Sequence, residues 1–91
     1  MGATSLSDVQ KTRTTVDIYG QQYVIVGTEN PGHVRLVASM VDEKMREIFS
    51  KNPSLDTSKL AVLTAVNAVN DYLKLLDQLE RLESELKRVK D

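Results

Sequence analysis

The chain has 91 residues, of which 27% are charged, with a formal net charge of −1 and no cysteine. A domain of this size has a small core that needs support, and without disulfides that support is expected from oligomerisation. The nearly balanced charge argues against nucleic acid or an anionic membrane as a partner, and no apolar stretch is long enough for membrane insertion. Because cysteine and a signal peptide are both missing, the sequence predicts a cytoplasmic protein.

The N-terminal part of the sequence predicts a tail followed by a β-hairpin. Residues 1–11 are mostly small and polar, with Leu6 and Val9 as the main apolar side chains, so we expect a mobile tail. Residues 12–19 alternate, with Thr14, Val16 and Ile18 on one face, which predicts a half-buried strand. A second strand over residues 23–26 follows a turn that we place at Gly20, Gln21 and Gln22.

A first helix is predicted after the hairpin. Asn30 and Pro31 resemble an N-cap followed by proline at the first helical position, and apolar residues then recur at helical spacing from Val34 to Ile48. The helix is expected to end near Ser50, before Asn52 and Pro53. The next helix has three residues able to cap it, Asp56, Thr57 and Ser58, so its start is left open within this group.

Residues 57–91 contain no Gly or Pro and carry two apolar stripes. One stripe, which we call the seam, steps by three and four residues along the whole segment, as in a coiled coil. The seam consists of Ala61, Ala65, Ala68, Tyr72, Leu75, Leu79, Leu82, Leu86 and Val89. The second stripe runs beside it and stops halfway. It consists of Val62, Val66, Val69, Leu73 and Leu76.

These patterns predict an α+β protein with a small head over residues 12–56 and a long helix over residues 57–91. The wide apolar face of the first half of this helix is expected to complete the head core, and the second half is expected to project as a coiled coil. A helix with a narrow apolar seam is only marginally stable alone in water, so it needs a partner helix. Two strands and two helices form only a thin layer, which also needs further packing. We therefore expect self-association, with two heads or two hairpins pairing. The alternative is that the seam packs on its own domain. The many charged residues in the second half of the long helix fit this alternative poorly.

The inventory of reactive side chains argues against an enzyme. The only histidine, His33, falls in the first turn of a helix, where a solvated side chain is the ordinary role, and no Gly-rich phosphate loop is present. The acidic residues near position 42 are better explained by intrahelical ion pairs, such as Asp42 with Arg46, than by a cation site. We therefore predict no catalytic residue, no metal, no cofactor and no small-molecule substrate.

Nucleic-acid binding is also disfavoured. Basic residues cluster at Lys11 and Arg13 and again over residues 87–90, but a basic-region zipper needs a dense basic helix directly before its heptads. Residues 60–76 occupy that place here and are mainly apolar. A nucleic-acid-binding regulator and a plain coiled-coil scaffold are kept as alternative functions.

Three segments together resemble the ZapA family of bacterial cell-division proteins. They are residues 14–20 (TTVDIYG), residues 41–48 (VDEKMREI) and residues 59–67 (KLAVLTAVN). The resemblance covers residues 12 to 90 in the right order, and the three segments are specific in combination.

The resemblance implies a cytoplasmic accessory protein at the division site that binds the tubulin-like GTPase FtsZ and promotes lateral association of its protofilaments. It also implies that the head forms a homodimer and contacts FtsZ, while the coiled coil joins dimers into a homotetramer. The seam here is shorter than in the longer family members, which leaves a dimer with a weaker dimer-of-dimers step as an alternative. Strand orientation stays open.

Exposed charges on the head are the candidate contacts with FtsZ. The acidic filament surface that the family implies favours the basic ones. The candidates are Arg13, Arg35, Lys44, Arg46, Glu47 and Lys51. For each of them, plain solvation of the head surface is the alternative role.

Overall fold

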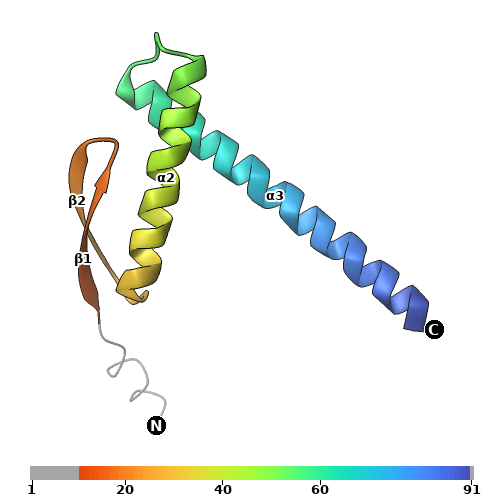
Figure 1. The fold of residues 1–91 in the computed structure, drawn as a ribbon. Coiled ribbons are helices and arrows are strands. Elements are labelled where there is room, and N and C mark those ends of the chain that lie inside the picture. The colour runs from red at the N-terminus through yellow and green to blue at the C-terminus, as the bar shows by residue number, and fades with distance from the viewer. Residues whose placement is uncertain (1–10, 91) are drawn as a thin grey trace. The chain divides into compact units, whose positions relative to one another are not determined.

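A computed structural model of the chain describes residues 11–90, so the part of the predicted tail over residues 1–10 lies outside the described residues. The elements follow one another as β1 (Thr12–Ile18), β2 (Gln21–Gly27), α2 (Pro31–Lys51) and α3 (Thr57–Lys90) (Figure 1). This order confirms the predicted α+β class, with a hairpin first and a long helix last. The chain divides between Pro53 and Ser54 into an N-terminal unit with the hairpin and α2, and a C-terminal unit with α3.

The hairpin is closed by a turn of two residues. Tyr19 and Gly20 have φ angles of 51° and 79°, and a type I′ turn requires positive φ at both positions. Because the turn is this short, Gln21 and Gln22 belong to β2 and pair with Ile18 and Asp17. The second strand therefore begins two residues earlier than the sequence predicted.

The core of the N-terminal unit lies between β1 and one face of α2. Thr14 and Val16 are buried while their neighbours Arg13, Thr15 and Asp17 are exposed, which confirms the predicted alternation. From α2 the buried side chains are Ala38, Met45 and Ile48. The spacing of seven and three residues places these three on one helix face, and α2 packs with that side toward β1.

Thr14 has a buried hydroxyl whose Oγ1 lacks a hydrogen-bond partner among the described residues, at 2% exposure of the residue. An unpaired buried polar group costs about 1–3 kcal/mol, and an apolar group of the same shape removes that cost. We expect Thr14→Val to raise the free energy of unfolding by about 1 kcal/mol, measured by urea denaturation. Thr15→Val, one residue along on the exposed face, is the control and should change stability by less than about 0.5 kcal/mol. A destabilised Thr14→Val variant would show that the hydroxyl is satisfied in the folded protein.

Local sequence signals fix both ends of α2. The Asn30 side chain accepts a hydrogen bond from the Gly32 N–H at 2.7 Å, with Pro31 at the first helical position as predicted. At the other end the Asn52 N–H donates to the carbonyls of Ile48 and Phe49, both at 3.0 Å. Pro53 then prevents the helix from continuing.

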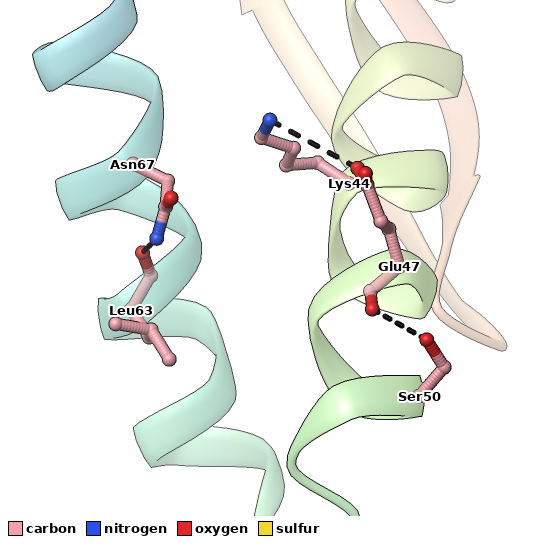
Figure 2. A network of polar contacts seen from close by, with 5 residues as sticks. All are labelled: Lys44, Glu47, Ser50, Leu63 and Asn67. Atoms are coloured by element: carbon pink, nitrogen blue, oxygen red, sulfur yellow. Dashed lines mark hydrogen bonds and ion pairs between the residues drawn. The ribbon is translucent and has the colours of Figure 1, made fainter.

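The C-terminal unit consists mainly of α3. Asp56 is the residue that caps it, because its Oδ1 accepts a hydrogen bond from the Lys59 N–H at 2.8 Å. Within the first turns, the Thr64 hydroxyl donates to the Leu60 carbonyl at 2.8 Å. The Asn67 side-chain amide donates to the Leu63 carbonyl at 2.9 Å (Figure 2). Over residues 11–90, neither helix is both long and apolar enough to cross a membrane.

Candidate interaction surface

An open groove runs along the N-terminal unit between β1 and α2, with a volume of about 590 Å³. Two of the predicted contact residues, Arg35 and Arg46, line it. They are 11 residues apart on α2, which is close to three helical turns and places them on the same side of the helix. The remaining lining residues are Thr15, Val16, Asp17, Gly20, Ala38, Ser39 and Asp42.

Arg46 is held in this groove by contacts with the hairpin turn. Its Nε donates to Oδ2 of Asp42 at 3.0 Å, and Oδ1 of the same carboxylate accepts from the Tyr19 N–H at 2.7 Å. The guanidinium carbon also lies 5.3 Å from the centre of the Tyr19 ring, within the range of a cation–π contact. We call these three residues the turn cluster. It fixes the hairpin turn to α2 and orients one exposed cation.

The charge state of the turn cluster is stable at neutral pH. The hydrogen bond from Arg46, followed by the one from the Tyr19 N–H, lowers the pKa of the Asp42 carboxyl below its ordinary value of 3.8. The same carboxylate raises the pKa of Arg46. Because the folded pKa of Asp42 is depressed, its contribution to stability is present above the ordinary carboxyl pKa and is lost only as the pH falls through the lowered value. The cluster therefore keeps its ion pair throughout the physiological range.

A second group of candidates lies on a different side of α2. Lys44 and Glu47 form an ion pair at 3.9 Å, and the Ser50 hydroxyl donates to the Glu47 carbonyl at 2.7 Å (Figure 2). Lys51, the last residue of α2, follows Lys44 by seven positions and falls on this side as well. Lys44 is nine residues from Arg35, which is two and a half turns and so the opposite side of the helix.

Arg13 belongs to neither group. It lies on β1 among the residues that alternate with the buried Thr14 and Val16, so its side chain points away from α2. The six predicted contact residues therefore divide into a pair in the groove, three on the other side of α2, and one on the outer face of the sheet. One flat binding surface cannot include all of them.

The seam on α3 is exposed along its whole length. Its larger members, from Tyr72 to Val89, are all more than half exposed, and the three alanines are exposed too. In the second half of α3, Asp77 and Arg81 form an exposed ion pair at 2.6 Å. An apolar seam of this length in water fits a helix that has a partner in its assembled form.

The second stripe is exposed in the single chain. Val66 and Val69 are 58% and 57% exposed, and the buried side chains of α3 are Leu60 and Thr64. Both stripes are therefore apolar and exposed in one chain, and completion of the head core by the first half of α3 stays a prediction.

The described side chains offer little to small-molecule chemistry. Over residues 11–90, no group of three or more His, Asp or Glu side chains is arranged to hold a metal ion. The groove is open and lined by charged and small residues, which suits contact with another protein better than enclosure of a substrate.

Sequence reasoning found the Asp42–Arg46 pair through its spacing of four residues but missed the part that Tyr19 plays. The contact between Tyr19 and Asp42 spans 23 residues, and no local pattern reports it. The available signal was a tyrosine directly before glycine at the end of a strand, where a turn is expected. Its ring also packs edge-on against Phe49 of α2, with centroids 6.3 Å apart.

Comparisons with known proteins agree with these features. The family model described as "Cell division protein ZapA" matches residues 14–91. A protein of that name from Geobacillus sp. (strain WCH70) is 64% identical over 86 residues, which cover 94% of this chain and 99% of the relative. The one from Bacillus subtilis (strain 168) is 62% identical over 82 residues, covering 90% and 96%. A solved structure, described as a ZapA mutant dimer from Geobacillus stearothermophilus, has a TM-score of 0.67 at 56% identity and covers 86% of this chain and 91% of that one.

Proposed function

The chain belongs to the ZapA family of cell division proteins, and from this premise we propose that it binds FtsZ polymers and joins neighbouring protofilaments side by side. The observation that carries the proposal is the family match itself, which spans both the hairpin unit and the long helix. In this account the protein acts at the division site as an accessory factor without catalysis. Its partners are FtsZ and further copies of itself.

The mechanism rests on valency. A particle with two or more identical binding surfaces can hold two filaments, because after the first contact the second becomes effectively intramolecular. The solved relative is a dimer, which supports a homodimer as the basic particle here. The seam then provides a second association between dimers. With 34 residues, α3 is about 50 Å long at about 1.5 Å per residue, enough to keep two binding surfaces apart.

We propose the groove side of α2 as the part that touches FtsZ. Arg46 is ordered by the turn cluster, so it loses little side-chain freedom when it meets a carboxylate on the filament. Arg35 lines the same groove and adds a second guanidinium. Guanidinium groups form paired hydrogen bonds with carboxylates, which gives such a surface preference for an acidic partner.

Charge reversal on the two sides of α2 tests this assignment. We expect Arg46→Glu to raise the dissociation constant for FtsZ polymers about tenfold, equal to about 1.4 kcal/mol, in a co-sedimentation titration with GTP, with unchanged circular dichroism and oligomer size. Lys51→Glu, on the other side of α2, and Arg88→Glu, exposed on α3, are matched controls and should bind normally. If Lys51→Glu is the variant that loses binding, the contact lies on the Lys44 side of the helix. Equal binding by all three would remove α2 from the interface.

A further inference from the structure

The open edge of β1 forms one wall of the groove. Ile18 and Gln21 flank the two-residue turn and form a hydrogen-bonded pair, and such pairs alternate with non-bonded pairs along an antiparallel ladder. Thr15 and Asp17 therefore belong to non-bonded pairs, and their backbone N–H and C=O groups point away from β2. Over residues 11–90 the sheet has only these two strands, so no third strand pairs with this edge.

The lining residues show that the groove lies at this edge. Thr15 and Asp17 line it together with Val16, although successive side chains on a strand point to opposite faces. Residues from both faces can share one groove where it runs along the edge of the strand. No described residue of β2 lines it. Tyr19 continues the outward series, and its N–H donates to Asp42 on α2 at 2.7 Å. The helix therefore occupies the edge at the turn and leaves it open before the turn.

α2 forms the opposite wall of the groove and runs beside β1 in the same direction (Figure 1). At the start of β1, the Thr12 hydroxyl donates to the carbonyl of Glu29, just before α2, at 3.2 Å. After the end of β1, the Tyr19 N–H meets Asp42, well inside the helix. An extended segment laid along the open edge of β1 therefore has α2 beside it over most of its length.

The two guanidinium groups of the groove match a pair of carboxylates on such a segment. Arg35 and Arg46 lie about 16 Å apart along the helix axis at about 1.5 Å per residue. Side chains on one face of a strand recur every second residue, so residues i and i+4 lie about 14 Å apart. Asp42 accepts from Nε of Arg46, whose side chain is 60% exposed, so the terminal nitrogens remain as donors. Between the two arginines, Ala38 and Ser39 are small and leave room for residue i+2.

We propose that the groove binds an extended acidic peptide segment of a partner protein, which adds to β1 as a third strand and places carboxylates four residues apart against Arg35 and Arg46. Main-chain hydrogen bonds to Thr15 and Asp17 provide affinity, and alternate side chains provide specificity, as in other cases of strand addition. Paired hydrogen bonds between guanidinium and carboxylate fix the register. The strands of a second copy do not fit this pattern, because β1 has one acidic residue and β2 has none.

This inference deepens the proposed function and rests on it only for the identity of the partner, FtsZ, so its first test uses the full-length chain without FtsZ. The probe is the fluorescein-labelled peptide Ser-Glu-Val-Thr-Val-Glu-Ser, which should bind saturably in fluorescence polarisation. Replacing both glutamates by glutamine should weaken binding about tenfold or more. Moving the second glutamate one position earlier places the two carboxylates on opposite faces and should weaken binding to a similar extent.

Matched variants of the protein locate the probe in the groove. Arg35→Gln and Arg46→Gln should each raise its dissociation constant about tenfold, while Arg13→Gln, on the outer face of β1, should leave it unchanged. Thr15→Pro removes an outward N–H and should weaken binding about tenfold, whereas Thr15→Val keeps that N–H and should bind normally. Circular dichroism checks that each variant is folded.

Two measurements distinguish strand addition from charge attraction alone. Hydrogen exchange at the N–H groups of Thr15 and Asp17 should slow about tenfold or more in the presence of saturating probe. N-methylation of the probe at its threonine, or separately at the valine that follows, should abolish binding in one case only, because successive N–H groups of a strand point to opposite sides.

The outcomes separate this inference from the proposed function. Displacement of the chain from FtsZ polymers by the probe supports both. Binding of the probe in the groove without displacement supports the acidic-strand site and removes FtsZ as its occupant. The inference is overturned if the probe does not bind, if the glutamine peptide binds as well, if both N-methylated probes bind normally, or if the probe binds only by dissociating the homodimer in sedimentation velocity. In those cases a chain that still bundles FtsZ leaves the proposed function intact.

Discussion

Removing the residues after Asp77 is expected to weaken bundling of FtsZ strongly while leaving binding to its polymers intact. The truncation deletes the last four seam residues, Leu79, Leu82, Leu86 and Val89, together with the Asp77–Arg81 ion pair. It spares the hairpin, α2 and the turn cluster. Without the second association between dimers, the particle loses the additional binding surfaces that the seam provides. Light scattering of FtsZ with GTP should be much lower than with the full-length protein, with co-sedimentation retained.

Substitution in the full-length chain separates the effect of the seam from the effect of length. Leu82→Ser with Leu86→Ser should reproduce the truncation, because it removes two apolar contacts and keeps the helix. Glu83→Ser with Glu85→Ser changes neighbouring exposed residues outside the seam and serves as the control. If the truncated protein bundles as well as the full chain at equal concentration, the dimer alone crosslinks filaments and the seam has no part in it.

Charges in the second stripe of α3 are expected to destroy the homodimer. Val66 and Val69 are exposed in the single chain, so they need a partner surface to be buried. Burying two valines contributes about 3 kcal/mol or more per chain, and an aspartate in each place adds the cost of an unpaired buried charge. We expect Val66→Asp with Val69→Asp to leave no dimer at micromolar concentration in sedimentation velocity. Because the small core of a single chain leaves much apolar surface uncovered, loss of helical signal should accompany it.

The control for this double variant adds the same charge to the same helix. Asn70→Asp with Ser84→Asp changes two exposed polar positions outside both stripes, and it should remain a folded dimer. A folded, dimeric Val66→Asp with Val69→Asp variant would show that the second stripe faces solvent in the assembly. The apolar surface that holds the dimer would then have to lie elsewhere.

The order of elements was accessible from the sequence because it depends on local patterns. The alternation around Thr14 and Val16 predicted β1, and Asn30 with Pro31 predicted the start of α2. The start of β2 was missed because the turn depends on Tyr19 adopting a positive φ, which fits its N–H bond to Asp42 on α2. A contact between distant residues fixed that local detail.

For the candidate interaction surface, the sequence predicted which charged residues could take part but not how they are arranged. Charges on the head could be listed from the sequence, and helical spacing alone could have divided Arg35 and Arg46 from Lys44 and Lys51. The ordering of Arg46 by Tyr19 required the fold. The second stripe was assigned to the head core because a wide apolar face usually packs inside a domain. The stripe is exposed in one chain, and its place in the head core stays a prediction.

Sedimentation at low speed shows whether this chain joins FtsZ filaments. Single filaments stay in solution at such speeds and bundles form a pellet. With purified FtsZ and GTP, adding the full-length protein should move FtsZ into the low-speed pellet as the protein concentration rises, and omitting GTP should prevent this. If FtsZ remains in the supernatant at every concentration while it still polymerises, the protein does not join filaments and the proposed function is wrong.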